Sequence, residues 1–193
     1  MFRDQKKYEE YAYVLDYLPH GRPGVPRTPH TAGGVLQLIG ESYFTLLEAS
    51  PKKEAVYNIR DRIFVGKGER ALVSHIISRI AYSDLTSSAK AELPSIIEQI
   101  VIQNEPFFVN FFNTSPSVTP RMHSLELLPG IGKKLMFHIL DLREKAPFKS
   151  FNDVEERVGL KTPAKQVAQR VLMELSGEEK YLLFTRPTAE RVF

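Results

Sequence analysis

The chain has 193 residues, of which 42% are hydrophobic and 25% are charged, a composition typical of a folded globular protein. Its 26 lysines and arginines exceed its 23 aspartates and glutamates by three, a balance that permits a polyanionic partner without requiring one. The absence of cysteine excludes disulfides, thiolate catalysis and cysteine-ligated metals, and no apolar run has the length of a signal peptide or a membrane span, so we expect a cytoplasmic protein.

Short segments rich in aromatic and β-branched residues, separated by glycines, fill the region up to about residue 80. The predicted strands are residues 11–18, the two halves of 33–48 on either side of a turn at Gly40-Glu41, and 62–65 and 71–80. A hairpin at Gly66-Lys67-Gly68 would join the last two, although residues 71–80 also fit a helix. Five short strands suit a small closed barrel. We therefore predict an OB-like or S1-like barrel domain over residues 1–83.

The segment from residue 19 to residue 31 contains four prolines and two glycines, and it carries no acidic residue. It is therefore predicted to be a loop. Loops at the mouth of a small barrel often bind single strands, so Arg22 and Arg27 are candidate nucleic-acid contacts. A proline-stiffened surface loop is the alternative.

Residues 84–118 are predicted to form a linking helical segment. Apolar residues at 96, 97, 100 and 101 have helical spacing, Thr86 can cap the first turn, and Pro94 is expected to kink or restart the helix. A second break is expected at residues 104–106. The four phenylalanines that follow, between residues 107 and 112, are interpreted as core or interdomain packing, with base stacking as the alternative.

A polar, proline-broken stretch at residues 113–120 is expected to separate the barrel region from an all-α domain over residues 119–193. Helices are predicted at about 120–128, 132–145, 151–158 and 163–176. Ser150 or Asn152 can cap the third helix, and Thr162 before Pro163 can cap the fourth. The apolar residues 181–184 are expected to pack back on the body.

The sequence LPGIGKK at residues 128–134 places a glycine-rich turn directly before a helix that begins with two lysines. Free backbone N–H groups, the positive helix end and the lysine charges would all favour an anion such as phosphate. The candidate contacts are Gly130, Ile131, Gly132, Lys133 and Lys134. An ordinary tight turn between two helices is the alternative.

These helices resemble the helix-hairpin-helix module, in which an apolar residue, glycine, apolar residue and glycine precede a helix. The resemblance implies contact with the sugar-phosphate backbone without base readout, through the N–H groups of Gly130, Gly132 and Lys134. Some members also bind a monovalent cation through hairpin carbonyls, which would correspond to Glu126, Leu128 and Ile131.

Residues 147–160 resemble the spacer and second hairpin of tandem modules. Gly159 has no second glycine after it, however, which puts phosphate binding by this hairpin in doubt. Lys161 and Lys165 would still add positive charge there, unless they simply form a solvated helix face.

The whole chain is also similar to an archaeal family, the domain-of-unknown-function family 655, which is regarded as nucleic-acid-binding. The similarity is carried by YVLDYLP at 13–19, DLTSSAK at 84–90 and HSLELLPGIGKK at 123–134. It implies an information-processing role that leans toward RNA or the ribosome, and it supplies no reaction.

No residue pattern predicts catalysis. The five histidines lack metal-ligand spacing, no Gly-x-x-x-x-Gly-Lys-Ser/Thr loop occurs, and Asp141 fits a helix-surface charge better than a glycosylase nucleophile. We expect a non-enzymatic nucleic-acid-binding protein without metal or cofactor, with RNA preferred over DNA as its partner. A DNA repair or replication accessory protein and a protein-interaction module are the alternatives, and the oligomeric state is left open.

Overall fold

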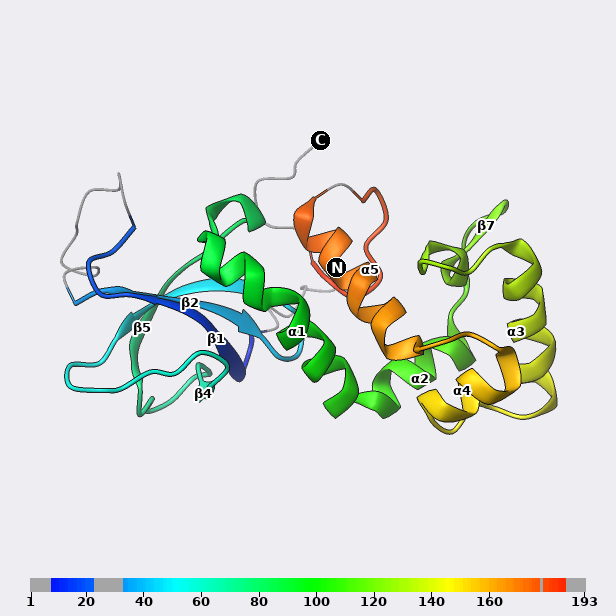
Figure 1. Ribbon diagram of the computed structural model, residues 1–193, viewed down its shortest axis with the longest axis horizontal. Helices are drawn as coiled ribbons and strands as arrows, with labels where there is room; N and C mark the ends of the chain where they lie inside the picture. The colour runs from blue at the N-terminus through cyan, green and yellow to red at the C-terminus, as the bar shows by residue number, and fades with distance from the viewer. Residues whose placement is uncertain (1–7, 23–32, 178, 187–193) are drawn as a thin grey trace, which may run out of the picture. The chain divides into compact units, whose positions relative to one another are not determined.

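A computed structural model describes residues 8–22, 33–177 and 179–186. These residues form a curled five-stranded antiparallel half-barrel sheet followed by five α-helices, so the predicted α+β class is confirmed (Figure 1). The described chain divides into two compact units at Leu93 and Pro94. The first unit also includes residues 175–177 and 184–186, and the second also includes 179–183. This division falls within α1 (Ser87–Gln103), whereas the predicted boundaries lie after residues 83 and 118.

The first unit contains the sheet and a short 3₁₀ helix, and every predicted strand is present. Its elements are β1 (Tyr11–Leu18), β2 (Val35–Gly40), β3 (Leu46–Pro51), β4 (Arg62–Phe64), β5 (Val73–Arg79) and η1 (Tyr82–Asp84). Residues 71–80 are thus a strand and not the alternative helix. The strand order is β4-β1-β2-β3-β5, and each neighbouring pair is antiparallel.

The predicted hairpin at Gly66-Lys67-Gly68 is not formed. Strands β1 and β3 run in the same direction because both are antiparallel to β2, and β4 and β5 are in turn antiparallel to them. Strands β4 and β5 therefore run in the same direction, and a tight turn cannot join parallel strands. Among the described residues they are the two unpaired edges of the sheet, which is open where the sequence predicted a closed barrel.

The two faces of the sheet carry different kinds of buried side chain. Alternate residues of the strands form an apolar cluster on the inner face, comprising Ala12, Val14, Leu36, Leu38, Leu47, Ala49, Ile63, Val65 and Val73. The opposite face carries the buried polar residues Gln37 and Glu48. Gln37 accepts a hydrogen bond from the Thr86 N–H at 2.9 Å, and Thr86 caps α1 (Ser87–Gln103) by accepting from the Ala89 N–H at 3.0 Å. The predicted cap is confirmed.

The turn between β2 and β3 is held by one buried carboxylate. Glu9 is 6% exposed and accepts hydrogen bonds from the backbone N–H groups of Ser42, Tyr43 and Thr45 at 2.9–3.1 Å. A side chain at Gly40 would place its Cβ only 2.0 Å from the Glu9 carboxyl carbon. Glycine is required here by this close approach of the carboxylate.

The second unit is mainly helical. It contains the part of α1 from Pro94 onward, α2 (Glu105–Thr114), β6 (Ser117–Thr119), β7 (Met122–His123), η2 (Ser124–Leu127), α3 (Lys133–Lys145), α4 (Phe151–Val158) and α5 (Pro163–Ser176). The last three predicted helices are confirmed. Helix α1 runs on through Pro94 without restarting, and the second predicted break, at residues 104–106, is confirmed because α1 ends at Gln103 and α2 begins at Glu105.

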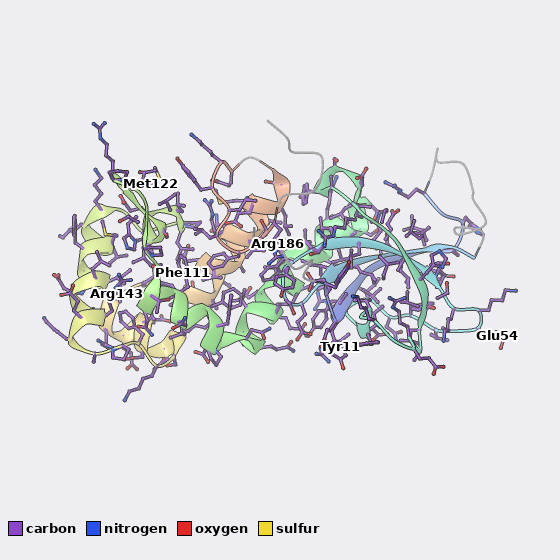
Figure 2. The ribbon with its side chains drawn as sticks, turned by 180° about the vertical axis from the view of Figure 1, so that it is seen from behind. Tyr11, Glu54, Phe111, Met122, Arg143 and Arg186 are labelled. Carbon is purple, nitrogen blue, oxygen red and sulfur yellow. The ribbon has the colours of Figure 1, made fainter. Side chains whose placement is uncertain are left out.

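The helix predicted at residues 120–128 is wrong. Pro120 and Arg121 form the turn of the small β6–β7 ribbon, in which Ser117 pairs with His123 and Met122 is partly exposed (Figure 2). Only η2 is helical in that stretch, and it is a 3₁₀ helix. The side chain of His123 caps it by accepting from the Leu125 N–H at 3.1 Å.

The four phenylalanines between residues 107 and 112 lie in helix α2. Phe108 and Phe112 are 3% and 0% exposed, which confirms their predicted core role, whereas Phe107 is 66% exposed. Arg143 of α3 donates to the carbonyls of Phe112 and Ser115 at 3.2 and 3.1 Å, which ties α3 to the end of α2 (Figure 2). The second unit is therefore stabilised by both apolar packing and charged hydrogen bonds to helix ends.

Candidate nucleic-acid interface

The turn before α3 is a β-turn closed by the Ile131 N–H, which donates to the Leu128 carbonyl at 3.1 Å. Pro129 and Gly130 occupy its two central positions, and Gly130 has a φ of +82°. Proline at the first central position and a positive φ at the second are characteristic of a type II turn. A side chain at residue 130 would be strained, so this glycine has a clear backbone role.

Helix α3 begins with unpaired donors. Its first helical hydrogen bond runs from the Met136 N–H to the Gly132 carbonyl at 2.9 Å, and Gly132 has no side chain to cap the helix. Within the described chain, the N–H groups of Lys133, Lys134 and Leu135 have no acceptor. Gly132 is exposed and has a φ of −89°. The helix therefore presents several N–H donors to solvent at its positive end.

The lysines at this end are not explained by helix stability. Lys133 and Lys134 are both exposed, and the first turn of α3 contains no acidic residue. Positive charge at a helix N-terminus is disfavoured by the macrodipole by about 0.3–1 kcal/mol, and acidic residues are the usual occupants. An anion bound at this turn would interact favourably with the donors, the dipole and both lysines.

The turn between α4 and α5 has a similar backbone but different chemistry. Gly159 ends α4 with a φ of +77°, close to that of Gly130, and Leu160 is buried as Ile131 is. Lys161 stands where the first turn has Gly132, and Thr162 has a φ of +50° before Pro163 begins α5. The second turn thus differs from the first at Lys161, Thr162 and Pro163, and the proline has no N–H to donate.

Helix α5 supports the first hairpin directly. A Cβ on Gly130 would lie 3.8 Å from the Gln166 Oε1 atom, so the turn lies against α5. Arg170 donates to the Leu127 carbonyl at 3.1 Å, and its side chain is only 2% exposed. A shallow hollow of about 610 Å³ lies between this turn and α5. Lys165 is exposed in the first turn of the same helix, and Lys161 is exposed just before it.

Arg170 is the centre of a buried ion network that sequence reasoning did not identify. Its guanidinium pairs with Glu174 at 2.9 Å and Glu179 at 2.8 Å, and it also contacts the Tyr181 carbonyl. Glu174 in turn accepts from the Leu183 N–H at 2.7 Å, which confirms that residues 181–183 pack back on the body. The i, i+4 spacing of Arg170 and Glu174 was the available signal, but such pairs usually lie on exposed helix faces.

His123 lies just before η2 and is buried, near Arg143 of α3. Burial and the nearby Arg143 charge lower its pKa, and the smaller effect of Glu126 opposes them. The imidazole is therefore held neutral, so that its Nδ1 atom can accept from the Leu125 N–H. The histidine shapes the entry to the hairpin and does not supply positive charge there.

Of the two arginines predicted as loop contacts, Arg22 is paired with acidic residues in the structure. Arg22 pairs with Glu48 at 3.0 Å and with Asp84 at 3.2 Å, so its guanidinium is neutralised by acids from β3 and η1. The loop's own sequence contains no acid, and these partners are distant in sequence. Arg27 lies outside the described residues. Contact of either arginine with nucleic acid stays a prediction.

Among the described residues no group of histidines and carboxylates has the arrangement of a metal site. No helix in that same part of the chain combines the length and apolarity needed to cross a membrane.

Three comparisons relate the chain to known proteins. Residues 8–186 match the model of the family described as Protein of unknown function (DUF655). An uncharacterized protein of Methanocaldococcus jannaschii, MJ0038, is 43% identical over 94% of this chain and 82% of its own length. The crystal structure of Af1531 from Archaeoglobus fulgidus, of the same family, matches with a TM-score of 0.82 and 47% identity, over 92% of this chain and 100% of that one. The chain therefore belongs to the DUF655 family.

Proposed function

We propose that this protein binds nucleic acid without catalysing a reaction on it, and that the turn before α3 anchors the phosphate backbone. In this proposal the second unit is a tandem helix-hairpin-helix module with one intact hairpin, and the half-barrel sheet is a relative of OB-like nucleic-acid-binding domains. In this proposal RNA is the preferred target, and duplex DNA is the main alternative.

One observation carries the proposal. Helix α3 combines unpaired N–H donors, a positive dipole end and the exposed Lys133 and Lys134, with no acidic residue in its first turn. A cap chosen for stability would have a serine, threonine or aspartate at residue 132 and acidic residues after it. The residues found there instead favour an external anion, and a phosphodiester has the required charge and acceptor oxygens.

The intact hairpin supplies few contacts, so affinity should be modest. A small number of phosphate contacts gives binding that weakens steeply with salt and shows little preference for sequence. Base selectivity would then have to come from another part of the chain.

The test is a binding titration of labelled single-stranded RNA, duplex RNA and duplex DNA against salt concentration. The variant Lys133→Ala/Lys134→Ala removes two charges at the N-terminus of α3, and Lys145→Ala/Lys149→Ala removes two exposed charges at and just beyond its other end. The first variant should lower the slope of log affinity against log salt by about one per lysine, whereas the second should leave it unchanged. Equal slopes for both variants and the unmodified protein would contradict backbone anchoring at this hairpin.

A protein-interaction role is favoured by a separate observation. Phe107 and Phe137 of the second unit are 66% and 59% exposed, which is unusual for large aromatic side chains. This alternative would be favoured by binding of a protein partner that is lost in Phe107→Ser/Phe137→Ser. The same binding should not change with either lysine variant, with salt or with added nucleic acid.

A further inference from the structure

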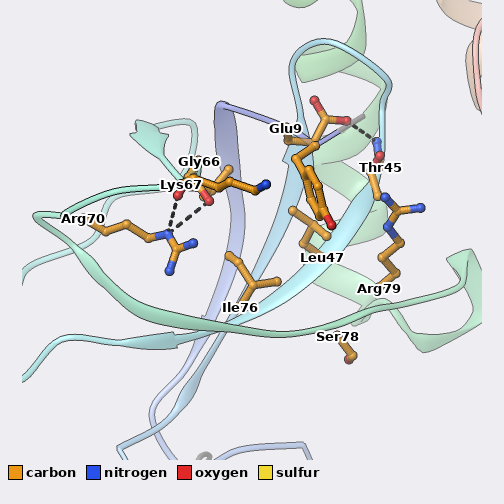
Figure 3. Close-up of a pocket in the computed structure, with 11 residues that line it drawn as sticks. Glu9, Thr45, Leu47, Gly66, Lys67, Arg70, Ile76, Ser78 and Arg79 are labelled. Atoms are coloured by element: carbon orange, nitrogen blue, oxygen red, sulfur yellow. Dashed lines mark hydrogen bonds between the residues drawn. The ribbon is translucent and has the colours of Figure 1, made fainter. Parts of the chain in front are cut away.

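The open side of the half barrel contains a pocket of about 290 Å³ (Figure 3). Its floor is apolar, because Leu47 and Val65 belong to the inner-face cluster of the sheet and Ile76 packs against that cluster. The pocket lies where β4 and β5 fail to pair, so it is bordered by the residues after β4 on one side and by β5 on the other. The open side of the sheet therefore forms a pocket.

The rim of this pocket is positively charged. Lys67, Arg70 and Arg79 line it, and Figure 3 shows them approaching it from different sides. None of the three forms an ion pair in the described part of the chain, unlike Arg22 in the same unit. The single carboxylate that lines the pocket, Glu9, is already saturated by backbone N–H donors. The charge of the pocket is therefore suited to an anion.

Each cation is positioned differently. The Arg70 Nε atom donates to the carbonyls of Val65 and Gly66 at 3.0 and 2.9 Å, which fixes its guanidinium at the rim (Figure 3). The Lys67 ammonium lies 4.8 Å from the centre of the Tyr8 ring, and Tyr8 is 51% exposed. Arg79 ends β5 and is exposed. An aromatic ring and three cations therefore surround an apolar floor.

We infer that this pocket binds one nucleotide, with the base on the apolar floor beside Tyr8 and the phosphate between the cations. A volume of about 290 Å³ lies just below the range of about 300–1,000 Å³ typical of small-molecule sites, so the pocket suits one nucleotide and not a longer ligand. Stacking on an aromatic ring tolerates every base, and the free edge of β5 offers backbone donors and acceptors to the base edge. An inorganic anion alone would leave the apolar floor unused.

This inference rests on the proposed nucleic-acid function and adds to it a site for one nucleotide in the first unit. The same chemistry is present in a free nucleoside monophosphate and in one residue of a single strand. The test should therefore include AMP, UMP, a 5′-phosphorylated RNA hexanucleotide and inorganic phosphate as separate ligands.

Amide chemical shifts of the full chain should report the site directly. Addition of either mononucleotide or the hexanucleotide should shift the resonances of residues 45–47, 65–70 and 76–79. Shifts by the hexanucleotide alone would identify a strand residue as the ligand, and shifts by AMP or UMP as well would identify a free nucleotide. No shifts in these segments, or equal shifts with inorganic phosphate, would overturn the inference.

Two kinds of variant separate charge from shape. Lys67→Ala/Arg79→Ala removes two rim cations, whereas Ile76→Phe enlarges a side chain that lines the pocket and packs against its apolar floor, and keeps every charge. Each should weaken binding of the shifting ligand by at least about tenfold. Lys53→Ala, an exposed lysine of the same unit that does not line the pocket, is the control and should not. Unchanged affinity in both pocket variants, with unchanged unfolding curves, would contradict the inference.

The hairpin variant keeps the two proposals distinguishable. Lys133→Ala/Lys134→Ala should leave mononucleotide binding in the pocket intact. Oligonucleotide binding that depends on the hairpin lysines but not on the pocket would support the proposed function and overturn this inference. The reverse pattern would support a nucleotide pocket and remove the hairpin as anchor.

Discussion

The two glycines of the hairpin have different physical roles, and substituting them one at a time is the sharpest test of the phosphate-anchor proposal. Gly132 has a φ of −89° and nothing within 4 Å of a built Cβ, so alanine or valine fits there without strain. Gly130 has a φ of +82°, where any L side chain is disfavoured. The first change alters only the exposed surface of the turn, whereas the second alters its backbone.

The expected stability effects follow from these angles. Alanine at residue 132 should lower the free energy of unfolding by a few tenths of a kcal/mol to about 1 kcal/mol, because alanine is a poorer N-cap than glycine. It should also raise the free energy of unfolding by about 0.4–1 kcal/mol, because the unfolded chain has less conformational freedom. Its unfolding temperature should therefore barely change. Alanine at residue 130 should cost about 1–2 kcal/mol for the left-handed conformation, which corresponds to a decrease of about 2–8 °C in a chain of this size.

Binding should respond in the opposite order. A side chain at the exposed residue 132 stands beside the free N–H groups of Lys133 and Lys134 and prevents close approach of a phosphate. Loss of one charge-assisted hydrogen bond costs about 1.5–3 kcal/mol, or roughly a ten- to hundredfold rise in Kd. Valine should weaken binding at least as much as alanine, because it covers more of the donor surface.

The assay is fluorescence anisotropy of labelled single-stranded RNA and duplex DNA at fixed salt, with thermal unfolding of the same samples. A stable Gly132→Val variant that binds as tightly as the unmodified protein would refute phosphate contact at these amides. Weakened binding by Gly130→Ala alone, in proportion to its instability, would assign the glycines a structural role only.

Four further outcomes are expected. Arg170→Met should lower the free energy of unfolding by about 3–5 kcal/mol in denaturant titrations, because Glu174 is 0% exposed and would lose its counter-charge; Glu179→Gln, at a 22% exposed partner, should cost much less, and equal costs would contradict a buried network. Arg22→Gln should destabilise the first unit, by about 1–3 kcal/mol, more than it weakens RNA binding, because it leaves the buried Glu48 without its ion pair; a large binding loss at unchanged stability would instead restore Arg22 as a direct contact. Stability should decline as pH falls below the unfolded histidine pKa of 6.5 toward the lowered folded pKa of His123, because the unfolded chain binds the proton more readily; His123→Asn, which keeps a capping acceptor, should flatten this decline in pH-dependent denaturation. Lys133→Ala alone should leave α3 as stable or raise its stability by about 0.3–1 kcal/mol, and a clear loss in thermal unfolding would mean that the lysine has a structural partner.

Local patterns predicted most of the secondary structure. The boundaries of β1, α4 and α5 follow from the runs of β-formers, the Ser150 cap and Pro163 at a helix start, all of which act within a few residues. The predicted Ser150 cap is confirmed by its acceptance from the Asp153 N–H at 3.1 Å. Local signals failed at residues 120–128, where the pairing of β6 with β7 determined the conformation.

The turn before α3 could likewise be predicted from seven residues, because a positive φ, an uncapped helix start and two lysines are all properties of adjacent positions. Its support by Arg170 could not, since that contact joins Leu127 to a residue 43 positions later. The pocket at the open side of the half barrel was equally hidden, because Lys67, Arg70 and Arg79 come together only around the gap between β4 and β5.

The sequence by itself determined the α+β composition, the strands and most of the helices, the caps and the uncapped, lysine-bearing start of α3. The tertiary structure alone decided that the sheet stays open, that Arg22 is neutralised by Glu48 and Asp84, and that three rim cations share one apolar hollow. The physical reason is the sequence separation over which each interaction acts. Backbone angles and helix ends respond to neighbouring residues, whereas the direction of β5 and the pairing of charges depend on residues that meet only after the chain has folded.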